Sequence, residues 1–401
     1  TKVHGARKAA AIKNAGKKLN IAADTLRLFT NKNEVSDAEY SWGILNESGT
    51  TNISGMTEID TTGYESSRAV EATEGTVTLE GLKAKVAAYN DAAALFTGSS
   101  GQIYANVKEG TAGSNTVKID GNVGAMGEAS RIDVAMVNKD SGVNGLAFGK
   151  GKINFWLQNG AVWNNEQYGA TVPDKEDNQL GHDYDYTFAG SRLSSLRGGN
   201  DANNAGVIFQ KNNKDITIDN YSGHTRVFYE HDAAAPTTIK GGDFRIKNAA
   251  AGSDITLTTD SSGLNTESTK ATDKNLVSAT LNALANKLWY TAYTTNERNL
   301  TGKVEIAEGL TSSSASKRLE NITFDTASGQ GRYVYTPQSE ATTDPIKESE
   351  TLSYDRQALA TAPNTKGGRI VSSLYTDNTA YDKQHPMVVD MNGHSLHLEA
   401  N

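Results

Sequence analysis

The sequence predicts a mainly β solenoid, in which short strands lie one above another in successive turns of the chain, here called rungs. Runs of alternating apolar and polar residues recur along the chain, and each run ends at Gly, Asn, Asp or Ser. Only 37% of the 401 residues are hydrophobic, which is too few for a thick core. Stacked rungs need only a thin core, because each strand satisfies its backbone hydrogen bonds with the rungs above and below it. A set of antiparallel sandwiches is the alternative.

Residues 1–20 are predicted to form a basic helical cap or the remnant of a leader. The stretch is rich in Ala, which has the highest helix propensity. Its basic residues are Lys2, Arg7, Lys8, Lys13, Lys17 and Lys18. The chain begins at Thr1 without an apolar signal segment, so we expect a mature fragment of a longer protein.

Residues 21–270 are predicted to form the rungs. The recurring unit is apolar-x-apolar-x-Gly, sometimes with Asn in place of Gly. It occurs in residues 52–59, 76–86, 102–107, 116–123, 131–137, 152–160, 215–220 and 243–248. Alternate side chains of a strand point to opposite faces, so Val77 and Leu79, like Ile216 and Ile218, would fill a narrow core while Thr and Asp face water. The irregular spacing indicates loops of varying length between rungs.

Residues 271–300 are predicted to be a helical insertion, with the helix near residues 272–298. Apolar residues recur there at helical spacing, and Asp273 or Thr272 could cap the N-terminus. The stripe consists of Val277, Leu281, Leu284 and Leu288, and it is extended by Trp289, Tyr290 and Tyr293. Packing of this stripe against the solenoid is favoured over an aromatic ligand site.

The C-terminal part is predicted to return to β structure around a long loop. Residues 301–337 form a β-rich segment, and residues 338–366, with Pro345 and Pro363, form a loop or domain junction. Residues 367–401 resume the rungs, with two alternating strands around the Asn392-Gly393 turn.

Composition and missing motifs exclude several classes of function. The chain has no Cys, which excludes disulfides, Cys-ligated metals and thiol catalysis. Its net charge of -8 gives no reason to expect nucleic-acid binding. The sequence contains no P-loop, dinucleotide fingerprint or calcium-binding nonapeptide repeat, so we expect no cofactor. No apolar run is long enough for a membrane-spanning helix.

Several segments combine a strand with a turn of a recurring kind. In residues 155–164 a strand ends in Asn-Gly-Ala and an aromatic residue restarts the next strand. Residues 191–199 have the pattern Ser-x-apolar-x-x-Leu and end in Gly-Gly, with Arg197 where an apolar residue is expected. These two segments resemble rungs in the passenger domains of type V autotransporters, and segments 288–291, 299–302 and 389–394 are similar to large anaerobe-type autotransporter adhesins.

The resemblance implies a right-handed parallel β-helix that is secreted through an outer-membrane barrel and displayed outside a Gram-negative cell. The protein would then be an extracellular adhesin that binds a glycan or protein of a host or bacterial surface, or another copy of itself. It would contact a membrane only through a C-terminal barrel that is absent from this chain. The lack of Cys fits this route, because a disulfide-closed loop threads a narrow pore poorly. A polysaccharide-acting β-helix enzyme and a structural spacer are the alternatives.

The densest group of functional side chains is predicted to be a ligand-binding site in a loop. It consists of His182, Asp183, Tyr184, Asp185 and Tyr186. Their nitrogen and oxygen atoms could bind a cation or a sugar. A strand would put His182, Tyr184 and Tyr186 on one face and the two acids on the other. No metal site is therefore predicted, and a solvated polar loop between Pro173 and Ser191 is the alternative.

Other residues of the chain have side chains that could serve catalysis or sugar binding. The Asp-Ser-Gly at Ser141 lacks the preceding Gly of a serine-protease nucleophile, so an ordinary β-turn is favoured and no catalytic residue is predicted. Stacked rungs could align acids for glycoside hydrolysis, provided that the register brings them together. The acids considered are Asp120, Asp133 and Asp219. Aromatic residues that could stack on sugars or fill the core are Trp163, Tyr184, Tyr186, Tyr221 and Tyr229.

Overall fold

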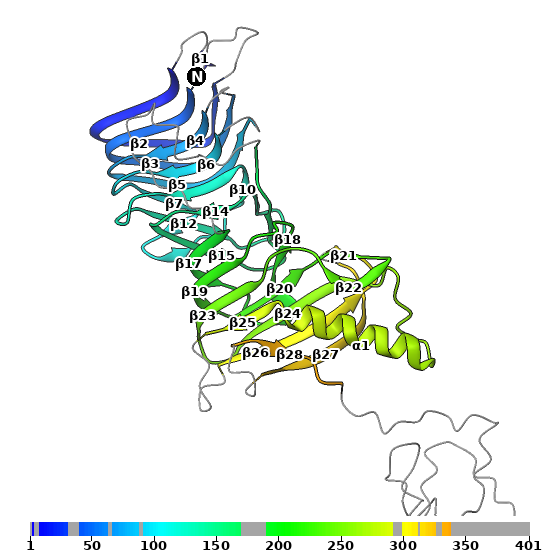
Figure 1. Ribbon diagram of the computed structural model, residues 1–401. Helices are drawn as coiled ribbons and strands as arrows, with labels where there is room; N and C mark the ends of the chain where they lie inside the picture. The colour runs from blue at the N-terminus through cyan, green and yellow to red at the C-terminus, as the bar shows by residue number, and fades with distance from the viewer. Residues whose placement is uncertain are drawn as a thin grey trace, which may run out of the picture. The chain divides into compact units, whose positions relative to one another are not determined.

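A computed structural model gives the fold of the chain (Figure 1). It describes residues 2–3, 8–30, 40–62, 66–87, 91–169, 190–291, 299–311, 313–325 and 331–337. The chain divides into two compact units. The first comprises Thr1–Ser268 and Asp273–Tyr335, and the second comprises Thr269–Thr272 and Thr336–Asn401. The architecture below is that of the first unit.

The described chain is mainly β, with a large, nearly closed and mostly parallel sheet of 24 strands. Most strands pair in parallel with a strand one rung earlier and with a strand one rung later, and these pairings form columns. The first column is β4 (Ser66–Ala72), β6 (Asp91–Thr97), β11 (Asn122–Ala125) and β14 (Ala147–Phe148). This parallel pairing is compatible with a β-helix-like fold and differs from the antiparallel sandwiches considered above.

Two further columns run through the whole stack. The second is β5 (Thr76–Val86), β7 (Gln102–Ala105), β12 (Arg131–Met136), β15 (Lys152–Leu157), β17 (Ser191–Arg197), β19 (Ile216–Ser222), β23 (Phe244–Ala249) and β25 (Leu288–Tyr290). The third is the end of β5, then β10 (Val117–Asp120), β13 (Gly142–Asn144), β16 (Val162–Asn165), β18 (Gly206–Gln210), β20 (His224–Phe228), β24 (Ser253–Asp260) and β26 (Leu300–Ala307).

Long strands begin the stack, and short antiparallel elements decorate or end it. β2 (Lys8–Thr30) pairs along its length with β3 (Tyr40–Thr61), and β1 (Lys2–Val3) pairs with the end of β2. Antiparallel hairpins are β8 (Val107–Lys108) with β9 (Thr111–Ala112), and β21 (His231–Asp232) with β22 (Ala235–Ile239). β27 (Ser316–Phe324) pairs antiparallel with β26 and with β28 (Tyr333–Val334). A short 3-10 helix, η2, spans Ala202–Asn204.

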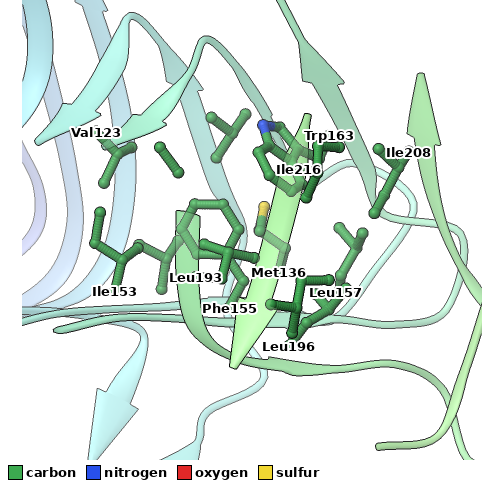
Figure 2. Packing of buried hydrophobic residues seen from close by; sticks show 14 of the residues in the cluster. Val123, Met136, Ile153, Phe155, Leu157, Trp163, Leu193, Leu196, Ile208 and Ile216 are labelled. Atoms are coloured by element: carbon green, nitrogen blue, oxygen red, sulfur yellow. The ribbon is translucent and has the colours of Figure 1, made fainter. Parts of the chain in front are cut away.

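The core lies between the columns and is built from stacked apolar side chains. Val77 pairs with Ile103, Ile103 with Ile132, and Ile132 with Ile153. All four side chains are buried, as are the residues in Figure 2, where Phe155 and Trp163 lie together. The register thus places like residues above one another, and their burial confirms that the apolar residues of the alternating pattern face inward.

The N-terminal helix predicted for residues 1–20 is wrong. The described residues of this stretch belong to β1 and β2. Ile12 pairs with Ile44 and Leu28 with Ile59, and both Ile44 and Leu28 are buried. Hydrogen bonding along β3 and burial of these side chains outweigh the helix propensity of the Ala-rich segment.

The predicted helix near residue 280 is confirmed, but it is shorter than predicted. Helix α1 spans Ala271–Ala285, so Thr272 and Asp273 lie in its first turn and do not precede it. Its buried stripe of Val277, Leu281 and Leu284 joins the core cluster. Leu288 is also buried, but in strand β25, where it pairs with Phe244.

A ladder of charges on the outer face of the third column makes stability depend on pH. Glu58 accepts hydrogen bonds from Arg27 at 2.8 Å and from Lys83 at 3.3 Å. These bonds, first that of Arg27, lower the pKa of Glu58 below its ordinary value of 4.5. Because the folded-state pKa is lowered, the stabilisation is present above pH 4.5 and is lost as the pH falls through the folded value.

We expect Glu58→Gln to unfold more easily than wild type at neutral pH, and the difference to shrink below pH 4.5. Urea denaturation of both proteins between pH 7 and 3 measures it. A difference that is constant across this range would show that the charge of Glu58 does not stabilise the fold.

Candidate functional site

A groove of about 990 Å³ crosses four neighbouring strands on the outer face of the second column. Its floor includes Asn52 of β3, Thr78 of β5, Tyr104 of β7 and Arg131 of β12. Asn52 pairs with Thr78 and Thr78 pairs with Tyr104, although successive members lie far apart in sequence. At about 4.8 Å between neighbouring strands, the floor extends about 14 Å along the column.

Alternation along each strand explains why these polar residues line the surface. Ile53, Leu79 and Ala105 follow Asn52, Thr78 and Tyr104, and these three apolar side chains are buried. Their neighbours therefore point outward. The core that holds the rungs together thus also fixes the spacing of the groove floor.

One end of the floor is held rigidly by an ion pair. Arg131 donates two hydrogen bonds to Asp133, from Nε to Oδ1 at 2.9 Å and from Nη2 to Oδ2 at 2.8 Å. Asp133 is fully buried and also accepts a hydrogen bond from Asn154 at 2.7 Å. The hydrogen bond to Asp133 is the main reason why the pKa of Arg131 is raised. Bidentate pairing of this kind fixes the guanidinium group.

Tyr104 adds an aromatic ring to the floor. Its hydroxyl donates to Gln102 Oε1 at 2.7 Å, and the guanidinium of Arg131 lies 5.9 Å from its ring centroid. Burial raises the pKa of Tyr104. The phenol donates its one proton to Gln102, so its oxygen is left to accept a hydrogen bond from a ligand.

The β8–β9 hairpin forms the rim of the groove. Its two turn residues, Glu109 and Gly110, both have positive φ angles, 51° and 76°, as a type I′ turn requires. Val107 is buried against Ala135 and Trp156 and holds the hairpin to the neighbouring rungs. Lys108 and Glu109 are exposed, and neither forms an ion pair with another described residue.

Asn106 anchors the base of this hairpin. Its side-chain amide donates to the carbonyl oxygens of Asn115 at 2.8 Å and Ala135 at 3.1 Å. A longer hydrogen bond of 3.2 Å joins it to the carbonyl oxygen of Gly113. Its Oδ1 accepts from the backbone N–H of Asn115 at 3.1 Å. Asn106 itself has a φ of 57° and is buried. One side chain thus ties both hairpin arms to the next rung.

The groove offers hydrogen-bonding groups of every kind but no evident nucleophile with a base. Two carboxyl groups line it, Glu80 and Glu109, and Glu80 accepts a hydrogen bond from the Gly55 N–H at 3.0 Å. Among the residues that the structure describes, no group of three or more His, Cys, Asp or Glu could hold a metal ion. The arrangement is suited to binding a polar ligand.

The predicted loop site lies outside the described residues. This applies to His182, Asp183, Tyr184, Asp185 and Tyr186. The site therefore stays a prediction. The loop and rungs predicted for residues 338–401 also lie outside the described part.

The three acids considered for glycoside hydrolysis do not come together. Asp120 lies in the third column and accepts a hydrogen bond from Asn144. Asp133 and Asp219 lie in the second column with β15 and β17 between their strands, which puts them roughly 14 Å apart. A retaining or inverting pair needs about 5 to 9.5 Å. Asp219 is instead paired with Arg192 and Lys247.

The described aromatic candidates and Ser141 are structural. Trp163, Tyr221 and Tyr229 are buried in the core and cannot stack on a sugar at the surface. Ser141 is also buried, and its hydroxyl donates to Asn138 Oδ1 at 3.0 Å while it accepts from the Val117 N–H. This is the β-turn that the sequence favoured, and the turn hydrogen bond from the Ser141 N–H to the Asn138 carbonyl is present.

Sequence reasoning missed the groove because its floor depends on register. Asn52, Thr78 and Tyr104 belong to three different runs, and only the pairing of strands aligns them. The hairpin did leave a signal. Glu109-Gly110 is an X-Gly pair between two short β stretches, which is the pattern of a type I′ turn.

The Asn-Gly-Ala and Gly-Gly motifs occupy corners between strands. Asn159 and Gly160 have positive φ angles of 54° and 74°, and the Ala161 N–H donates to the Gln158 carbonyl, so β15 turns directly into β16. A Cβ on Gly199 would lie 1.9 Å from the Asn204 carbonyl oxygen, so this corner requires glycine.

Within the described residues, no helix has both the length and the apolar character needed to cross a membrane. Comparison of the whole chain with protein-family models, with curated proteins and with solved structures gave no match.

Proposed function

We propose that this chain is the adhesin passenger of a type V autotransporter, a right-handed parallel β-helix displayed on the outside of a Gram-negative cell. The observation that carries the proposal is the second column, which runs in parallel from β5 to β25, together with β3, which pairs in parallel with β5, and the polar groove on their outer face. The motifs of residues 155–164 and 191–199, which resemble such passengers, comprise parts of β15, β16 and β17 and the corners that follow β15 and β17.

A scaffold of this kind suits adhesion to a surface. Its rungs present outward side chains at a regular spacing of about 4.8 Å, so that one ligand can contact several rungs. Many copies on one cell would bind a surface by multivalency even if each contact is weak. The proposed binding partner is a glycan or protein of a host or bacterial surface, or a second copy of this chain.

Ion pairs occupy several acids on the described faces, which supports binding over catalysis. Asp254 lies 3.1 Å from Lys303, and Glu305 lies 2.7 Å from Arg226. Carboxylates held in such pairs already have a basic partner within the chain. Glu80, Glu109 and Arg131 nevertheless line one groove, and this favours a polysaccharide-acting enzyme as the second candidate.

Beads coated with the purified chain test the proposal. The coated beads are incubated with glycan arrays, with epithelial cells and with other beads that carry the same chain. Sugar released into the same wells is measured. Beads that carry an unrelated β protein are the control. Saturable binding without release of sugar is expected. Release of sugar would move the enzyme to first place, and an absence of both would contradict adhesion and leave a structural spacer.

A further inference from the structure

We propose that the groove bounded by β3, β5, β7, β12 and the β8–β9 hairpin binds a short uncharged oligosaccharide that lies along the column, with Glu109 at its rim as a hydrogen-bond acceptor for sugar hydroxyl groups. The inference deepens the proposed adhesin function and rests on it.

The shape of the groove fits a chain-like ligand. It crosses four strands in the stacking direction, about 14 Å at about 4.8 Å per strand, and residues of the hairpin also line it. Each rung contributes one outward polar side chain in register, Asn52, Thr78 and Tyr104 in turn. A floor that repeats in this way can contact a polymer with a repeating unit.

The chemistry of the lining fits a ligand rich in hydroxyl groups. Hydroxyl and amide side chains both donate and accept hydrogen bonds, as sugar hydroxyls do. The Thr78 hydroxyl and the Asn115 amide form no side-chain hydrogen bond with another described residue. The lining carries two acids, Glu80 and Glu109, and two bases, Lys108 and Arg131. Arg131 is already paired with Asp133, so the groove has no excess of basic groups that would select an acidic ligand.

Glu109 is the residue that structure alone does not explain. Its φ of 51° lies in the left-handed region, which disfavours residues with a Cβ other than Asn and Asp. The same chain uses the preferred Asn-Gly pair at Asn159-Gly160, where the φ angles are 54° and 74°. A strained residue held at the rim of a groove indicates a function for its side chain, and the carboxylate has no ion-pair partner among the described residues.

The experiment replaces Glu109 with the residue that the turn prefers. Cellohexaose, maltohexaose and chitohexaose are titrated into the whole chain by calorimetry, and the probe that binds wild type is titrated into Glu109→Asn. We expect the melting temperature of the variant to rise and its affinity to fall about tenfold, which is the loss of one charge-assisted hydrogen bond. If Glu109 served only the turn, the melting temperature would rise without a loss of affinity.

Two further variants complete the test. Thr78→Val keeps the shape of a β-branched side chain and removes the floor hydroxyl, so its affinity should fall several-fold with the fold intact. Glu267→Asn makes the same change as Glu109→Asn at an exposed residue outside the groove and should bind as wild type does.

The outcomes separate this inference from the proposed function. If Glu109→Asn and Thr78→Val bind the probe as wild type does, the groove is not the site, although the chain still binds a glycan. If none of the three probes binds, the inference is overturned, and binding of the same preparation to cells and matching beads then decides the adhesin function independently.

Discussion

Replacement of Trp163 by Ala is expected to lower the free energy of unfolding by about 3 to 5 kcal/mol. Trp163 is fully buried in β16 and is stacked between Val143 and Ile208 of the neighbouring rungs. Its ring meets that of Phe155 edge to face, with 5.3 Å between centroids. Removal of the indole therefore leaves a cavity that two rungs and a facing strand cannot close. Denaturation in guanidinium chloride, followed by circular dichroism, measures the loss.

Trp163→Phe serves as the control for the hydrogen bond. Trp163 Nε1 donates to the Gly145 carbonyl oxygen at 2.9 Å in the buried core. Phe retains an aromatic ring but leaves that carbonyl without its partner, which should cost about 1 to 3 kcal/mol. If Trp163→Ala lowered the free energy of unfolding by less than about 1 kcal/mol, the result would contradict packing of Trp163 in the core. A role of Trp163 in stacking on a sugar would then have to be tested.

The strands of the stack could be predicted because their signal is local. Val77 and Leu79, or Ile216 and Ile218, alternate with polar residues, and all four are buried as the alternation requires. The helical stripe of Val277, Leu281 and Leu284 was equally readable, because a periodicity of 3.6 residues extends over several turns.

The ends of these elements could not be predicted, because pairing with distant residues decides them. Leu288 continues the helical spacing of α1, yet it forms β25 by pairing with Phe244. The Ala-rich residues after Lys8 favour a helix locally, yet β3 offers them a continuous partner strand. In both places hydrogen bonds to a neighbouring rung outweigh local propensity.

The candidate groove was hidden for a related reason. Periodicity shows that Asn52, Thr78 and Tyr104 face outward, but it does not show which of them lie above one another. A shift of register by two residues would keep every side chain on its face and still break up the floor. Because the register is not visible in the sequence, Asp120, Asp133 and Asp219 could be proposed as a group of catalytic acids. The observed register separates them.

Replacement of Asn106 by Ala is expected to destabilise the fold by about 2 to 4 kcal/mol and to open the groove. The side chain supplies hydrogen bonds to Asn115 and Ala135 that no other group replaces, and the site is buried. Ala must also adopt a φ of 57°, which costs a residue with a Cβ about 1 kcal/mol or more. Amide hydrogen exchange of the hairpin, compared with exchange in β12, measures the local part of this loss.

Asn106→Gly separates the two causes. Glycine adopts the left-handed conformation without strain but lacks the amide group, so it should lose the hydrogen bonds alone and be about 1 kcal/mol more stable than the Ala variant. Both variants should bind the oligosaccharide probe more weakly than wild type, because the hydrogen bonds of Asn106 at the hairpin base help to position Glu109 and Lys108. If hairpin exchange and probe affinity are unchanged in both, Val107 packed on Trp156 is sufficient to hold the rim, and the groove does not depend on Asn106.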